Sequence, residues 1–193
     1  MGVRIVPDIL ARATSISHDF ISRLVNPGDM VIDATVGNGH DTLFLANLVG
    51  DTGKVYGFDI QEKAIEKATL LLSKHNLTDR VSLILDGHEN MEKYVQHPVR
   101  VIMFNLGYLP GGEHEIITKK ETTITAFKKS LSLLATDGLL SVVIYSGHQG
   151  GAEEKLAVEA FFKAIPKNEL QVVKIQHLNR LESSPYVILA QNQ

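Results

Sequence analysis

The chain has 193 residues, 44% of them hydrophobic, a length that suffices for one buried core but not for two independent domains of ordinary size. It contains no cysteine, which excludes disulfides, thiolate metal sites and a cysteine nucleophile. The net charge of -3 argues against a large non-specific nucleic-acid surface, and no apolar run approaches the roughly 18 residues of a membrane span, so we expect one cytoplasmic domain over residues 1–193.

The predicted elements begin with an amphipathic helix in an N-terminal extension formed by residues 1–25. Its apolar side chains are mostly three and four residues apart, which is the spacing of one helix face. Pro27 and Gly28 end this helix. A strand at 30–34, a glycine turn and a helix through about residue 48 follow, and then a strand at 55–59 and a helix at 62–75.

The second half of the chain continues the alternation of strands and helices. Apolar, partly β-branched runs predict buried strands at 80–85, 99–105 and 139–145, and helices are expected at 122–134 and 153–164. Two further strands, at 171–177 and 186–190, are separated by a short loop and should pair antiparallel. This order predicts an α/β fold with a Rossmann-like, doubly wound, mostly parallel seven-stranded sheet and an antiparallel C-terminal hairpin.

The turn after the first strand, Gly37-Asn38-Gly39, is the first candidate site. Glycine allows positive φ and a close approach of the backbone to a ligand, while the following helix offers unpaired N–H groups. Asp59 ends the second strand twenty residues after Gly39, where a carboxylate can accept hydrogen bonds from ribose hydroxyls. Two simpler interpretations remain open: a plain tight turn at the glycines, and Asp59 as the cap of the next helix.

The charges around this turn indicate which nucleoside cofactor it suits. Asp33 and Asp41 flank the glycines, and carboxylates repel a pyrophosphate but attract the cationic sulfonium and ammonium of S-adenosylmethionine. The dinucleotide pattern also asks for a small residue where this chain has Thr42, and no Walker pattern is present. We therefore expect S-adenosylmethionine in preference to NAD or a nucleoside triphosphate.

The third strand ends at Asp86-Gly87-His88, a position that faces the adenine in this architecture. Asp86 or the backbone of His88 is a candidate for binding the exocyclic amine of the adenine. For His88 alone, a surface loop is an equally good interpretation.

The fourth strand leads into Asn105-Leu106-Gly107-Tyr108-Leu109-Pro110-Gly111-Gly112, which resembles the Asn-Pro-Pro-Tyr loop of amino-group methyltransferases. That resemblance implies that Asn105 accepts a hydrogen bond from the target nitrogen and that Tyr108 stacks on a base. Methyl transfer from a sulfonium is an in-line displacement, so acceptors that aim the nitrogen lone pair suit this chemistry. An ordinary polar turn after a buried strand is the structural alternative.

Two further groups lie near the predicted substrate end. His148 follows the fifth strand at the same edge of the sheet, where it is a candidate proton acceptor, substrate clamp or packing residue. Lys119 and Lys120, with Lys128 and Lys129, are the densest basic group, and they are interpreted as RNA contacts or as a solvated helix face.

These motifs together resemble a family of small bacterial methyltransferases formerly called rRNA methylases. The residues that carry the resemblance are Asp33-Ala34-Thr35-x-Gly37-Asn38-Gly39-His40-Asp41-Thr42, Phe58-Asp59-Ile60-Gln61, Phe104 to Gly112, and Tyr145-x-Gly147-His148. The resemblance covers nearly the whole chain and implies a class I methyltransferase fold. It also implies methyl transfer from S-adenosylmethionine to the amine of 5-aminomethyl-(2-thio)uridine at the tRNA wobble position. The cofactor would then lie on Asn38, Asp59 and Gln61, with Asn105 and Tyr108 near the target uridine.

The complete set of predicted site residues combines the motifs with this resemblance. Cofactor contacts are expected from Asp33, Gly37, Asn38, Gly39, Asp41, Asp59, Ile60, Gln61, Gly87, His88 and Asn105. Catalytic roles are expected for Asn105, Tyr108 and His148, and substrate contacts for Leu106, Gly107, Tyr108, Pro110, Gly111, Gly112, Lys119 and Lys120. We expect no metal and no membrane, and the anticodon region of tRNA and a second copy of the chain in a homodimer as partners. The alternatives are an rRNA or small-molecule N-methyltransferase, and a nucleotide- or RNA-binding protein without catalysis.

Overall fold

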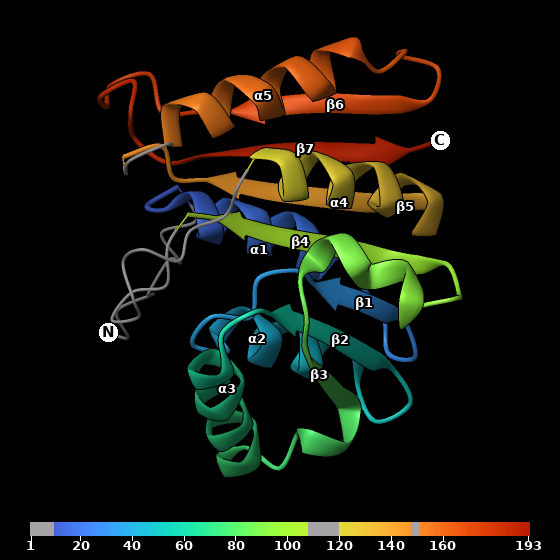
Figure 1. Cartoon of the computed structure of the whole chain (residues 1–193). Coiled ribbons are helices and arrows are strands. Elements are labelled where there is room, and N and C mark those ends of the chain that lie inside the picture. Colours follow the sequence, from blue (N-terminus) through green and yellow to red (C-terminus); the bar gives the residue numbers. More distant parts are fainter. Residues whose placement is uncertain (1–9, 108–119, 148–150) are drawn as a thin grey trace, which may run out of the picture.

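The computed structural model describes residues 10–107, 120–147 and 151–193. They contain a seven-stranded sheet with the strand order β3-β2-β1-β4-β5-β7-β6 (Figure 1). The strands are β1 (Met30–Asp33), β2 (Lys54–Asp59), β3 (Val81–Leu85), β4 (Val99–Leu106), β5 (Leu134–Ile144), β6 (Leu170–Ile175) and β7 (Tyr186–Asn192). β1 to β5 run parallel, and β7 is antiparallel to both of its neighbours. This confirms the predicted mostly parallel sheet with an antiparallel C-terminal hairpin.

The strand order reverses at β1, and this reversal determines where a ligand can bind. The chain proceeds from β1 to β2 and β3 on one side, and then returns to place β4 on the other side of β1. The connections that leave β1 and β4 therefore diverge at the carboxyl edge of the sheet. In open α/β sheets this is the position of the ligand crevice.

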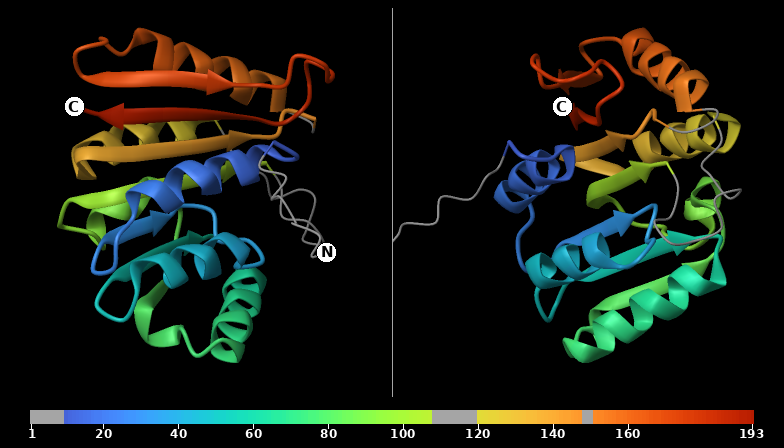
Figure 2. Two further views of the ribbon diagram at one scale, coloured as in Figure 1. Left: turned by 180° about the vertical axis from the view of Figure 1, so that it is seen from behind. Right: turned by 90° about the vertical axis from the view of Figure 1, so that its left-hand side faces the viewer.

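Helices cover both faces of the sheet (Figure 2). One face carries α1 (Ala13–Leu24), α2 (His40–Val49) and α3 (Glu62–Lys74), and the other carries α4 (Lys120–Leu133), α5 (Gly151–Ala164) and the short 3-10 helix η2 (His88–Lys93). Each face has its own apolar core, because successive side chains of a strand point to opposite faces. In β4, Ile102 and Phe104 belong to the core that α4 covers, whereas Val101 and Met103 belong to the core that α1 and α2 cover.

The predicted N-terminal helix is present but is described over a shorter range. α1 begins at Ala13, and residues 1–9 lie outside the described part of the chain. Ile16 and Ile21 bury its apolar face, and the helix lies against β5 and β7. None of the described helices has the length and apolar character needed to cross a membrane.

The start of β5 differs from the prediction. The strand begins at Leu134, and not at residue 139, because the chain already pairs there with Val99 of β4. The register then shifts between Val99 and Val101, and Asp137 adopts a φ of 59°. Thr136, Asp137 and Gly138 are typical turn residues, so the sequence pattern favoured a loop over an irregular strand at this position.

Candidate active site

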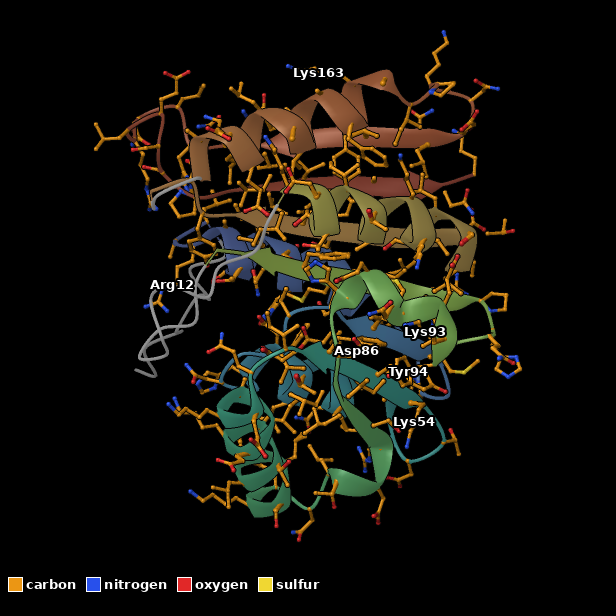
Figure 3. The ribbon with its side chains drawn as sticks, in the orientation of Figure 1. Arg12, Lys54, Asp86, Lys93, Tyr94 and Lys163 are labelled. Carbon is orange, nitrogen blue, oxygen red and sulfur yellow. The ribbon has the colours of Figure 1, made fainter. Side chains whose placement is uncertain are left out.

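A cavity of about 780 Å³ opens at the carboxyl edge of the sheet. Its walls are the turn after β1, the ends of β2 and β4, the loop after β3 and the beginning of α1. In Figure 3, Asp86 marks the wall after β3 and Arg12 marks the wall at α1. The cavity lies beside the reversal of strand order, and its volume suits a nucleoside-sized ligand.

The turn between β1 and α2 has the backbone conformation that glycine permits. Gly37 and Gly39 have φ values of 54° and 83°, both in the left-handed region. Gly39 is the N-cap of α2, and a Cβ at this position would lie 2.8 Å from the Cα of Ala68 in α3. Gly37 and Asn38 line the cavity, whereas Gly39 allows α2 and α3 to approach each other.

Asp33 lies beneath this turn and not in the wall of the cavity. It is 1% exposed, and its carboxylate accepts hydrogen bonds from Thr42 Oγ1 at 2.6 Å and from the Thr35 N–H at 3.1 Å. Burial, followed by repulsion from the Asp41 carboxylate, raises the pKa of Asp33 to about 7. Asp33 thus does not line the cavity, and its bonds make it a support of the turn; its contact with the cofactor stays a prediction.

Asp59 ends β2 and borders the cavity together with Ile60 and Gln61. Its Oδ2 accepts a hydrogen bond from the Gly37 N–H and its Oδ1 from the Gln61 N–H, both at 2.9 Å. These bonds tie the glycine turn to the start of α3. A carboxylate offers about four acceptor positions, so Asp59 keeps the capacity to accept from ribose hydroxyls as well. The alternative interpretation of Asp59 as the cap of α3 is wrong, because Gln61 is the N-cap of this helix and no described side chain caps it. Asp59 lies before the helix and accepts from the N–H of the cap residue.

The loop after β3 brings Asp86, Gly87 and His88 to the cavity. Asp86 accepts hydrogen bonds from the Gly87 N–H at 2.8 Å, from Asn90 Nδ2 at 2.8 Å and from the Tyr94 hydroxyl at 2.9 Å. Slight burial raises the pKa of Asp86, but the hydrogen bonds from Asn90, Tyr94 and Gly87 outweigh it, so the pKa lies below its usual value. Asp86 is therefore a fixed carboxylate at the cavity wall, with Tyr94 beside it (Figure 3).

The side chain of His88 turns into the core instead of lying on a surface loop. Its Nδ1 lies 3.1 Å from the carbonyl oxygen of Ala34, and its ring packs edge to face on Phe104. A carbonyl can only accept, so Nδ1 carries the proton and Nε2 of the neutral ring is an acceptor. Burial lowers the pKa of His88 and so favours this neutral form. Among the described residues, no group makes a hydrogen bond with Nε2.

Asn105, at the end of β4, is held by two hydrogen bonds. Its N–H donates to Thr35 Oγ1 at 2.7 Å, and its Nδ2 donates to Oδ2 of Asp41. Asp41 stands in the first turn of α2, and its Oδ1 lies 2.6 Å from Nε2 of His18 in α1. The Oδ1 of Asn105 is buried, and no described residue donates to it. The sequence predicted Asn105 and Asp41 but not His18 or Thr35, since nothing in the spacing links α1 to the glycine turn.

Tyr145 is a further cavity residue; it belongs to a motif that the sequence analysis quoted, but no role was predicted for it. It follows β5, and its N–H donates to the Leu106 carbonyl at 3.2 Å. Burial, with a contribution from the Asp41 carboxylate, raises the pKa of its hydroxyl, which is thus a neutral hydrogen-bonding group at neutral pH.

The described residues of the predicted substrate end are only partly brought together. Leu106 and Gly107 line the cavity, whereas Lys120 forms ion pairs with Glu121 and Glu153 at 3.8 and 3.5 Å and does not line it. Residues predicted in this region that lie outside the described part of the chain are Tyr108, Pro110, Gly111, Gly112, Lys119 and His148. Their predicted roles stay predictions.

The strand order and the cavity at the carboxyl edge define the class I methyltransferase fold. A family model described as "Putative rRNA methylase" matches residues 55–191. The chain belongs to this family.

Relatives and solved structures agree with this assignment. The chain is 41% identical over 179 residues to the "tRNA (mnm(5)s(2)U34)-methyltransferase, chloroplastic" of Arabidopsis thaliana; the match covers 88% of this chain but only 65% of the plant protein's length. A crystal structure described as "putative rRNA-methylase" from Clostridium thermocellum superimposes with a TM-score of 0.92 at 48% identity, covering 94% of this chain and 98% of that one. A methyltransferase from Streptococcus mutans in complex with SAH gives a TM-score of 0.86 at 40% identity, with the same coverage.

Proposed function

We propose that this protein transfers a methyl group from S-adenosylmethionine to the amine of 5-aminomethyl-(2-thio)uridine at the wobble position of tRNA, giving 5-methylaminomethyl-(2-thio)uridine. The observation that supports this proposal most directly is that two buried acceptor atoms at the cavity have no hydrogen-bond partner among the described residues. Among the described residues, the buried side-chain atoms without a hydrogen-bond partner are His88 Nε2 and Asn105 Oδ1. Both residues line the cavity, and both atoms are acceptors. A buried acceptor without a donor costs free energy, so the site favours a ligand that brings N–H groups.

The residues around the cavity fit S-adenosylmethionine. All of the following residues line the cavity. In this proposal Asp59 accepts from the ribose hydroxyls, Asp86 and Gly87 bind the adenine, and the backbone of Gly37 and Asn38 contacts the methionine part. Carboxylates at this edge repel a pyrophosphate and attract a cation, which disfavours NAD. When bound, S-adenosylmethionine supplies an electrophilic methyl group.

The task of the protein is then to orient the amine. Its nitrogen must be unprotonated, because the lone pair forms the new N–C bond while the C–S bond breaks and its electron pair goes to the sulfur. The product ammonium afterwards releases a proton to solvent or to an acceptor in the site. Asn105 Oδ1 accepts one N–H of the amine and so aims the lone pair at the methyl carbon. Neutral His88 carries a second acceptor, Nε2, which is unpaired among the described residues and is buried beside the same cavity.

The choice of substrate is supported by the plant relative, whose name states methylation of a tRNA wobble uridine. We extend this to an approach of the tRNA anticodon region to the rim of the cavity. The reaction would then take place in the compartment that holds tRNA, which in a bacterial cell is the cytoplasm.

The proposal is tested with purified protein, S-adenosylmethionine and tRNA that carries 5-aminomethyl-2-thiouridine. Nucleoside mass spectrometry should show conversion to the 5-methylaminomethyl form. The same tRNA with an unmodified wobble uridine should remain unchanged, because it lacks the amine. Methylation of rRNA but not of this tRNA would favour an rRNA N-methyltransferase. Cofactor binding without methylation of any RNA would favour a non-catalytic binding protein.

A further inference from the structure

The inner wall of the cavity contains a chain of three side chains from three elements. His18 in α1, Asp41 in α2 and Asn105 in β4 are linked through the carboxylate of Asp41, which uses one oxygen for each neighbour. The ring of His18 is stacked on Phe44, with ring centroids 3.8 Å apart and planes 8° from parallel. The side chains of His18 and Asp41 are 30% and 18% exposed, so this linkage is largely screened from water.

The chemistry of the carboxylate determines how its neighbours are oriented. An ionised carboxylate accepts hydrogen bonds and cannot donate them. The His18 nitrogen that faces it must therefore carry a proton, and Asn105 must turn its NH₂ group toward it. The main chain of Asn105 is fixed separately by the bond to Thr35 Oγ1. The side-chain amide of Asn105 can still adopt two orientations, in which Nδ2 and Oδ1 exchange places. The hydrogen bond to Asp41 selects the orientation in which Nδ2 faces the carboxylate.

We propose that Asp41, steadied by His18, is a positioning residue that holds the amide of Asn105 with Oδ1 presented to the target amine. The identity of the amine rests on the function proposed above. With the opposite flip, Asn105 would present its NH₂ group, a donor, to the nitrogen that must keep its lone pair free. This also gives α1 a role at the site, because it supplies the ring that fixes Asp41 from the side away from Asn105.

A swap of the two side chains tests the proposal directly. Asn105→Asp alone sets two carboxylates against each other and should lower kcat strongly. In the double variant Asp41→Asn/Asn105→Asp, the new amide at position 41 accepts from His18 and donates to the new carboxylate at position 105, whose second oxygen is again an acceptor for the amine. We expect the double variant to recover kcat by roughly tenfold over Asn105→Asp, within the coupling range of residues in contact. The KM for S-adenosylmethionine should change by less than about threefold, since the orientation of the amine is what differs.

The matched control is Asp51→Asn, the same substitution beyond the other end of α2, where the side chain is 85% exposed. It should leave kcat unchanged and should not rescue Asn105→Asp. His18→Phe keeps the ring on Phe44 but removes the hydrogen bond to Asp41, and it should lower kcat by roughly two- to fivefold. A double variant that is folded, binds S-adenosylmethionine and is no more active than Asn105→Asp overturns the proposal.

A second readout needs no substrate and separates this inference from the proposed function. The side-chain ¹⁵NH₂ resonances of Asn105 are identified by their loss in Asn105→Asp. They should shift in Asp41→Asn and, to a smaller extent, in His18→Phe, and stay in place in Asp51→Asn. Unshifted resonances in both variants would show that Asp41 does not orient this amide. If wild-type protein fails to methylate the aminomethyluridine tRNA, the proposed function is wrong. The resonances still show whether Asp41 orients the side-chain amide of Asn105.

Discussion

Asp33 stabilises the glycine turn through hydrogen bonds although it does not line the cavity. Its buried carboxylate accepts hydrogen bonds from the Thr35 N–H and the Thr42 hydroxyl. Burial raises the pKa of this group from 3.8 to about 7. The folded protein therefore binds this proton more tightly than the unfolded chain. As the pH rises from about 4 to about 7, the unfolded chain loses the proton first, so this group lowers the free energy of unfolding across that window. The turn thus rests on a carboxyl group that costs stability at neutral pH.

Asp33→Asn should remove this pH-dependent loss. The amide still accepts from the Thr35 N–H, and the Thr42 hydroxyl can rotate to accept from the new NH₂ group. We expect the variant to gain stability relative to wild type as the pH rises from 5 to 8, by about 1–3 kcal/mol in all. Urea unfolding at several pH values measures this difference. A difference that is constant with pH would mean that the folded pKa of Asp33 is not raised.

Asp59→Ala should weaken the binding of S-adenosylmethionine by roughly 1–3 kcal/mol, the cost of leaving buried ribose hydroxyls unpaired. The substitution also frees the N–H groups of Gly37 and Gln61, so the turn itself should loosen. Titration calorimetry on the folded variant measures the affinity, with Asp51→Asn as the control. Unchanged affinity would remove Asp59 from the cofactor site.

At the scale of elements, the sequence predicted those parts of the structure that depend on local periodicity. Buried runs such as 99–105 and the glycine turn with Asp59 beyond it were assigned correctly, because strand alternation and turn chemistry are local signals. The contact of α1 with Asp41 was not predictable, since it joins residues 23 positions apart through packing on β5 and β7. The inward turn of His88 depends likewise on the Ala34 carbonyl, 54 residues earlier.

The crossing of α2 and α3 depends on a single glycine. Gly39 has a φ of 83°, and a Cβ there would meet Ala68 Cα at 2.8 Å, so Gly39→Ala combines a strained backbone with a clash. We expect a loss of roughly 2–4 kcal/mol in the free energy of unfolding. Gly147→Ala is the matched control, because nothing lies within 4 Å of its added Cβ, and it should cost less than about 0.5 kcal/mol. Equal effects of the two substitutions in chemical denaturation would contradict this account of the crossing.

At the scale of the whole molecule, the site is assembled from neighbouring strands in the middle of the sheet and from the N-terminal helix. β1 and β2 supply the turn and Asp59, β4 supplies Asn105, and α1 brings His18 and Thr14 across the carboxyl edge. The polar groups of the described walls thus divide by chemistry into carboxylates, such as Asp59 and Asp86, and neutral acceptors without a partner, at His88 and Asn105. This division suits a reaction in which a cationic methyl donor and a neutral amine must meet. The homodimer stays a prediction.

The dependence of the rate on pH tests this division. An alkylammonium group has a pKa near that of lysine, about 10.4, so most of the proposed amine substrate arrives protonated at neutral pH. Single-turnover rates should therefore rise by about tenfold per pH unit until the bound amine has lost its proton. His88 should not add a step of its own between pH 7 and 9, because burial lowers its pKa and the ring is already neutral there. A flat profile in single turnovers would mean that a protonated amine is not the resting form of the substrate.

Two variants of His88 test its role as an acceptor. His88→Gln, which keeps a neutral acceptor, should retain the slope of the pH profile with a moderate loss of rate, whereas His88→Leu should lose more rate at every pH. Equal rates for the two variants would remove His88 as an acceptor.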